Sequence, residues 1–183
     1  MSKQIYIVIS QTGTILSRIL KAITGAEYNH ASLSLVSDLK TMYSFGRLNP
    51  YNPFLGGFVV ESPCFGTFKR FSRTKAAVLA IDISEEKYLK IKETLDDMCS
   101  ESKNYHYNYL GLFMAAFHIN RKKENCYYCS EFVKDILQKY NIEGASQLHP
   151  IVKPINFLSL PHKLIYCGKL SEYSNTQKAC CDK

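Results

Sequence analysis

The stretch ENCYYCSEFVKDIL, residues 124–137, places two cysteines three positions apart, and a predicted helix begins on the second one, Cys129. Apolar residues recur behind it at helical spacing and form one side of the helix, at Phe132, Val133, Ile136, Leu137 and Tyr140. Cys129 lies on that same side, in the first turn. The positive end of a helix dipole favours a thiolate, and the unpaired N–H groups of a first turn can hold a developing oxyanion. The stretch therefore favours a cysteine nucleophile, provided that the chain also supplies a base.

His30 is the best base that the sequence offers. It opens the stretch HASLSLV, residues 30–36, in which polar and apolar residues alternate. This alternation predicts a half-buried strand with His30 at the head of its polar side. A cysteine nucleophile needs a nearby base that is itself oriented by a third polar group. Ser44 falls on the polar side of the next predicted strand, and Glu61 is the carboxylate alternative. The candidate catalytic residues are therefore Cys129, His30 and either Ser44 or Glu61.

The rest of the chain predicts an α+β fold with a β-rich first half and a helical second half. Strand patterns fall at 5–10, 30–36, 41–47, 58–62, 66–71, 76–83 and 163–170. Helix patterns fall at 14–23, at 108–117, from Ser84 onward, and from Cys129 to before Gly144. Residues 47–57, rich in Asn, Pro and Gly, predict a loop. No linker divides the chain, so we expect one domain over 1–173 and a loose tail over 174–183.

Three segments, YNHASLSLV at 28–36, MYSFG at 42–46 and YYCSEFV at 127–133, resemble the permuted papain-like amidases, often called YiiX/YaeF-like. These belong to the NlpC-type superfamily of cysteine peptidases. The resemblance, which spans residues 5–140, implies an antiparallel, β-barrel-like sheet packed on a helical half that carries the nucleophile helix. It also implies that Cys129 is the nucleophile and His30 the base. The third member in that family is usually an acid or other polar residue on the strand after the histidine. By register this is Ser44, which departs from the commoner glutamate, so Glu61 stays open.

Other uses of the CxxC pair are less well supported by the sequence. A zinc site needs a second pair of ligands, and Cys64, Cys99 and Cys167 are isolated. A thioredoxin-like redox pair follows a strand in a βαβ unit, whereas a basic loop precedes Cys126. We therefore expect no metal and no cofactor. Cys126 is interpreted as a spectator, or as a thiol that can trap Cys129 in a disulfide under oxidation.

Composition and charge bound the location and the partners. The 183 residues carry a formal net charge of +7, which weakly favours anionic partners. The basic residues are scattered along the chain, so no specific nucleic-acid partner is expected. No apolar run suits a signal peptide or a membrane span, and the seven cysteines are an odd count for a disulfide scaffold. These features predict a cytoplasmic protein with free thiols.

The sequence thus predicts a cysteine hydrolase that cleaves an amide or ester bond through a thioester on Cys129. A peptide, an amide or an acyl lipid is the expected substrate. Related lipid enzymes of the permuted fold use the same dyad for acyl transfer, so a lipid acyltransferase or thioesterase is an alternative, with the aromatic residues of 48–57 as an acyl-chain rim. A non-catalytic module that binds an anionic partner is the alternative from a different class.

Overall fold

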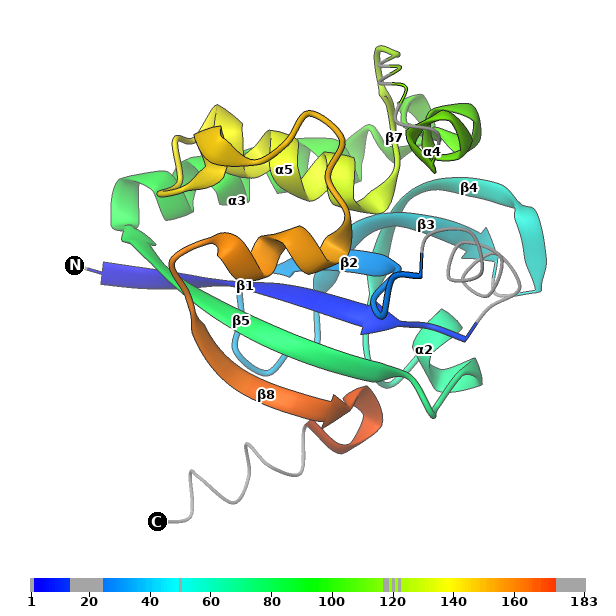
Figure 1. The fold of residues 1–183 in the computed structure, drawn as a ribbon, viewed down its shortest axis with the longest axis horizontal. Coiled ribbons are helices and arrows are strands. Elements are labelled where there is room, and N and C mark those ends of the chain that lie inside the picture. The colour runs from blue at the N-terminus through cyan, green and yellow to red at the C-terminus, as the bar shows by residue number, and fades with distance from the viewer. Residues whose placement is uncertain are drawn as a thin grey trace.

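An open β-sheet with strand order β7-β6-β4-β3-β2-β1-β5-β8 runs through the molecule (Figure 1). The computed structural model describes residues 2–13, 25–49, 51–116, 119, 121 and 123–173. The strands are β1 Ser2–Gln11, β2 His30–Ser34, β3 Met42–Asn49, β4 Asn52–Glu61, β5 Lys75–Ser84, β6 His106–Tyr107, β7 Cys126–Tyr127 and β8 Lys163–Lys169. Neighbouring strands pair antiparallel except β6 and β7, which are parallel. The fold is therefore mixed α+β, as predicted.

Helices cover both faces of this sheet. Their bounds are α2 Gly66–Arg70, α3 Glu85–Ser100, α4 Tyr109–Ala116 and α5 Cys129–Lys139, and a 3₁₀ helix spans Pro154–Ser159. Helices α3 and α5 lie on one face of the sheet, whereas α2 lies on the other (Figure 1). None of the described helices is long and apolar enough to span a membrane.

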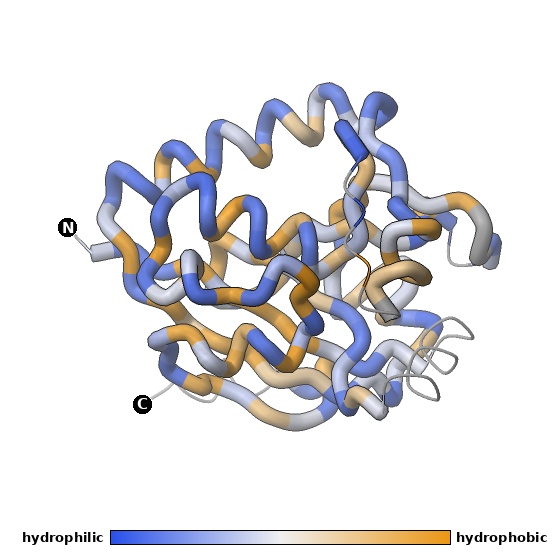
Figure 2. The backbone as a smooth tube through the Cα atoms, turned by 45° about the horizontal axis from the view of Figure 1, so that its top comes forward, coloured by the Kyte–Doolittle hydropathy of each residue, from blue (hydrophilic) through white to orange (hydrophobic). Residues whose placement is uncertain are grey.

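The apolar run IYIVI in β1 explains why both faces are covered. Alternate residues of a strand point to opposite faces, so an unbroken apolar run supplies two cores. Ile5, Ile7 and Ile9 belong to the core beneath α3 and α5, whereas Tyr6 and Val8 belong to the core on the side of α2. Hydrophobic positions accordingly gather along the central strands (Figure 2).

This double coverage corrects one expectation about β2. The predicted polar side of that strand is not solvated, because Ser32 and Ser34 are fully buried and His30 is only 9% exposed. The second core, which includes Phe68 of α2, covers it. A buried polar side chain needs a hydrogen-bond partner, so the polar residues of β2 must be paired inside the protein.

Two of the predicted elements around α2 are wrong. Of residues 66–71, predicted as a strand, 66–70 form the helix α2, in which Phe68 points into the second core while Lys69 and Arg70 stay outside. Residues 47–49 and 52–57, predicted as part of a loop, belong to strands β3 and β4. Asn49 pairs with Asn52 between these strands, and the Asn49 side chain accepts a hydrogen bond from the Tyr51 N–H at 2.8 Å.

The expected barrel-like closure is also wrong, since the sheet is open and β7 and β8 form its two edges. Strands β6 and β7 contain only two residues each, too few for the alternation that reveals a strand in a sequence. The other predicted strands and the helices beginning near Ser84, Asn108 and Cys129 are present. The predicted helix at 14–23 and the predicted tail at 174–183 lie outside the described residues.

Candidate active site

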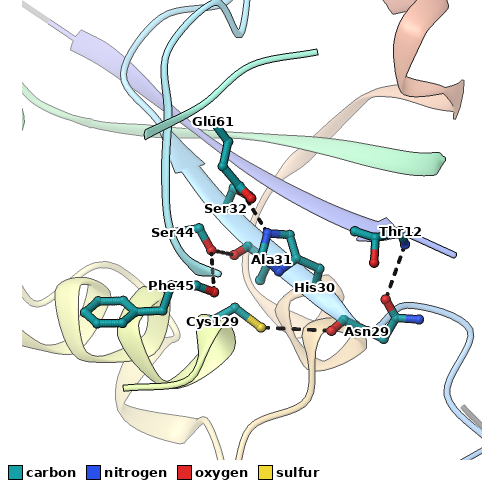
Figure 3. A network of polar contacts seen from close by, with 9 residues as sticks. All are labelled: Thr12, Asn29, His30, Ala31, Ser32, Ser44, Phe45, Glu61 and Cys129. Carbon is teal, nitrogen blue, oxygen red and sulfur yellow. Dashed lines mark hydrogen bonds and ion pairs between the residues drawn. The ribbon is translucent and has the colours of Figure 1, made fainter. Parts of the chain in front are cut away.

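A buried imidazole–carboxylate pair lies at the end of β2. His30 is the first residue of β2 and Glu61 is the last residue of β4, and His30 Nε2 lies 2.9 Å from Glu61 Oε2 (Figure 3). The hydroxyl of Ser32 donates to the same carboxylate oxygen at 2.8 Å. The two paired side chains are 11% and 10% exposed. The carboxylate therefore fixes both the orientation and the protonation pattern of the imidazole.

The surroundings of His30 favour its charged form. Burial alone lowers the pKa of the imidazole, because it removes water from the cation. The negative charge of Glu61, hydrogen bonds to Cys129 and Glu61, and the charge of a Cys129 thiolate act in the opposite direction and outweigh burial. The pKa of His30 therefore lies well above the ordinary value of 6.5.

Cys129 lies next to this pair, at the first position of α5. The thiol is buried, with 3% of the residue exposed, and its Sγ lies 3.9 Å from the Asn29 carbonyl oxygen (Figure 3). It also interacts with the His30 ring. Since Glu61 occupies Nε2, Nδ1 is the ring nitrogen left for the thiol. The backbone N–H of Cys129 lies in the first turn, where helix N–H groups have no intrahelical partner.

Polar contacts fix where α5 begins. The Glu131 carboxylate accepts a hydrogen bond from the backbone N–H of Tyr128 at 3.4 Å, which closes the first turn back on the preceding residue. Ser130 Oγ donates to the Val152 carbonyl at 2.7 Å, and Lys134 Nζ donates to the Pro150 carbonyl at 2.5 Å. The helix start, and with it Cys129, is thus tied to the segment 150–154.

Ser44 does not orient the imidazole. Its hydroxyl is fully buried and donates to the Ala31 carbonyl at 2.7 Å, so the predicted contact with His30 is replaced by one with the backbone of β2 (Figure 3). The hydroxyl also lies 3.4 Å from the Phe45 carbonyl oxygen, so both of its acceptors are backbone carbonyls (Figure 3). Of the two candidates for the third position, Glu61 is the one that contacts His30.

A glycine that the sequence interpretation missed makes the Glu61 contact possible. Glu61 comes from β4, and β3 lies between β4 and β2, so the carboxylate must pass over β3 to reach His30. A Cβ at Gly46 would lie 3.3 Å from Glu61 Oε1 and 3.6 Å from His30 Cε1. Gly46 follows Ser44 by two residues in the same strand, so the two positions face the same side of the sheet. This spacing is the sequence feature that could have identified Gly46 as a position facing the site.

An apolar hollow opens beside the thiol, with a volume of about 60 Å³. Cys129 and Tyr128 line it together with Leu112 and Ala115 of α4 and with residues 151–154. The neighbouring α4 also exposes Leu110 and Phe113 at its surface. An apolar group of a substrate is the chemistry that fits these walls.

The other cysteines that the structure describes do not extend the site. Cys126 is buried in β7, and it is a free thiol, as is Cys129. Within the described ranges, no group of three or more His, Cys, Asp and Glu side chains is placed to hold a metal ion. Comparisons of the chain with protein-family models, curated proteins and solved structures found no match.

Proposed function

We propose that this protein is a cysteine hydrolase that cleaves an amide or ester bond, with Cys129 as nucleophile, His30 as general base and Glu61 as the residue that orients His30. The observation that carries this proposal is the 2.9 Å contact from Glu61 to His30 Nε2, combined with a helix-terminal thiol that interacts with the same imidazole. This is the arrangement that activates a cysteine: a nucleophile, a base, and a third group that holds the base. The resemblance to permuted papain-like amidases supports the same roles.

In the proposed reaction, the proton of the Cys129 thiol moves to His30 Nδ1 before the attack, because the raised pKa of His30 favours the thiolate–imidazolium pair, and the thiolate sulfur then attacks the carbonyl carbon. The backbone N–H of Cys129 stabilises the tetrahedral oxyanion. His30 then protonates the leaving amine or alkoxide, and a thioester remains on Cys129. A water molecule, deprotonated by the imidazole, attacks the thioester and releases the acid. Glu61 stabilises the imidazolium in both steps and keeps Nδ1 directed at the sulfur.

Brief treatment with limiting iodoacetamide, followed by peptide mapping, tests the nucleophile. We expect Cys129 to be alkylated faster than the exposed Cys64 and Cys167, and Cys129→Ala to abolish hydrolysis of amide and ester substrates without unfolding the protein. Cys126→Ala is the matched control and should keep most activity. A protected Cys129 with slow, scattered labelling, or activity that depends on Cys126, would overturn the assignment.

The apolar hollow favours acyl transfer on a lipid as a second candidate function. Its walls at Leu112 and Ala115 suit an acyl chain better than a polar peptide. The two functions differ in what attacks the thioester. An added amine or alcohol that captures the acyl group in competition with water would support transfer, whereas release of free acid alone would support hydrolysis.

A further inference from the structure

A second hollow, of about 340 Å³, lies between the end of β1 and the turn that joins α2 to β5. It is lined by residues 11–13 and 70–74, so its walls combine backbone groups with Arg70, Arg73, Thr12 and Thr74. Its volume falls in the range of small-molecule sites, roughly 300–1,000 Å³, whereas the apolar hollow at Cys129 is much smaller. The proposed reaction uses none of these residues.

The segment that supplies residues 70–74 of the lining is strongly basic. Residues 66–75 include Lys69, Arg70, Arg73 and Lys75, and they include no aspartate or glutamate. In the part of the chain that the structure describes, no ion pair joins Arg73 to a carboxylate. The Arg70 guanidinium lies 4.2 Å from the centroid of the Tyr51 ring, which holds it at the tip of the β3–β4 hairpin. The charge of the hollow therefore suits an anion.

Arg47 adds a half-buried cationic group that interacts electrostatically with Arg70. Its Nη2 atom is buried and has no hydrogen-bond partner. Burial lowers the pKa of the guanidinium, and the charge of Arg70 lowers it further, which places the two arginines within electrostatic reach of each other. A buried polar atom without a partner is costly, and an anion bound near Arg70 would also reduce the repulsion between the two guanidinium groups.

The basic hollow adjoins the candidate catalytic residues through two contacts. The Thr12 N–H donates to the Asn29 side-chain oxygen at 3.4 Å, and the Asn29 carbonyl accepts from Cys129 (Figure 3). On the other side, the ring of Phe68 in α2 lies 6.0 Å from the ring of His30, and Arg70 follows it at the end of the same helix. Asn29 thus links the hollow to the thiol. Helix α2 carries both Arg70, which lines the hollow, and Phe68, which lies beside the imidazole.

We propose that this hollow is a substrate subsite that binds a carboxylate or phosphate group attached to the compound whose amide or ester bond Cys129 cleaves. The inference rests on the proposed function, because it assigns part of the same substrate. Arg70 and Arg73 bind the anion, and the apolar hollow beside Cys129 takes the uncharged part of the molecule. The substrate class is thus an amide or ester that carries both an anionic group and an apolar group.

Paired thiol reagents test this proposal without a known substrate. N-Ethylmaleimide and N-(2-carboxyethyl)maleimide react by the same addition to the thiolate and differ in charge. We expect the carboxylated reagent to label Cys129 about tenfold faster than the neutral one, an effect of the size that local electrostatic attraction produces. Arg73→Gln, an exposed substitution that leaves the core intact, should bring this ratio close to that at the exposed Cys64.

Lys163→Gln is the matched control, since it removes the same charge at the far end of β8, whose other end pairs with Lys75. A rate ratio that is unchanged in Arg73→Gln, or that falls equally in Lys163→Gln, overturns the proposal. Inorganic phosphate and acetate, added at constant ionic strength, should compete with the carboxylated reagent, and the stronger competitor identifies the preferred anion. If neither phosphate nor acetate competes, the proposal is also overturned.

A direct binding measurement separates this proposal from the proposed function. If N-ethylmaleimide labels Cys129 no faster than Cys64, the nucleophile assignment fails, and phosphate binding is followed by NMR instead. Phosphate would then be expected to shift the amide signals of Gly13 and Thr74 in the unmodified protein and not in Arg73→Gln. This result would support an anion site in a non-catalytic binding protein and would overturn the proposal that the hollow is a subsite for cleavage. If phosphate shifts neither amide signal, the anion site itself is overturned.

Discussion

Glu61 and Ser44 have different environments, and this difference separates their expected roles. The Glu61 carboxylate contacts the imidazole directly and places a negative charge beside it, whereas the Ser44 hydroxyl donates a hydrogen bond to a backbone carbonyl of β2. We expect Glu61→Gln, which keeps the shape and removes the charge, to lower hydrolysis and the alkylation rate of Cys129 by at least about tenfold. Ser44→Ala should leave both rates nearly unchanged. It should lower the free energy of unfolding by about 1–3 kcal/mol, because the Ala31 carbonyl loses its buried partner.

Urea denaturation and alkylation kinetics on the two variants measure these effects side by side. Loss of reactivity in Ser44→Ala with retention in Glu61→Gln would return Ser44 to the third catalytic position.

Gly46 matters for the space it leaves. A methyl group there would lie 3.3 Å from Glu61 Oε1 and from Val59 Cγ2, closer than most side-chain contacts. We expect Gly46→Ala to displace the carboxylate from His30 and to slow alkylation of Cys129 severalfold, at a cost in stability of roughly 1–3 kcal/mol for overpacking. Val60→Ala, at an exposed position of β4, is the control and should leave the alkylation rate unchanged. Equal rates in both variants would show that the site tolerates a side chain at this position.

At the scale of elements, the first turn of α5 is held by its neighbours as well as by its own hydrogen bonds. The helix buries nearly its whole first two turns, including Ser130 and Lys134, whose polar atoms bond to carbonyls at 150 and 152. Segment 150–154 also lines the apolar hollow. The position of the nucleophile and the shape of the hollow are therefore coupled through these two contacts.

Ser130→Ala tests that coupling. It leaves the Val152 carbonyl without its 2.7 Å partner, so we expect the free energy of unfolding to fall by about 1–3 kcal/mol. Hydrogen exchange of the amides in 150–154 should accelerate, and selectivity among acyl substrates should change more than the alkylation rate of Cys129. Ser159→Ala, which removes an exposed hydroxyl that bonds to Asn156, is the control and should show none of these changes. Unaltered exchange in 150–154 would contradict the coupling.

The elements that the sequence predicted correctly are those whose pattern is local. The alternation in HASLSLV and the helical spacing behind Cys129 depend on neighbours within one element, and both elements are present. The helix α2 could not be predicted in this way, because Phe68 is buried by partners as distant as Tyr173. Tertiary packing there overrides a strand-like composition.

For the whole molecule, the choice between Ser44 and Glu61 shows where sequence reasoning ends. It depends on the register of three strands and on the absence of a side chain at Gly46, and neither quantity is visible in any one segment. The coverage of both sheet faces is equally non-local. The sequence predicts His30 on the polar side of a half-buried strand, whereas the second core buries it, and its charge is therefore coupled to the stability of the whole fold.

That coupling predicts a pH dependence of global stability. The pKa of His30 is raised well above 6.5 in the folded protein, so the folded state binds its proton more tightly than the unfolded chain does. The resulting stabilisation is complete below about pH 6.5 and is lost as the pH rises through the folded-state pKa, with a slope approaching about 1.4 kcal/mol per pH unit. Urea denaturation from pH 6 upward at constant ionic strength measures it. Glu61→Gln should flatten the slope, because it removes the largest cause that raises this pKa, and Cys129→Ala should flatten it less, because each of the two contributions of Cys129 is smaller than that of the Glu61 charge. A slope that persists in Glu61→Gln would show that the His30–Glu61 pair does not govern the dependence.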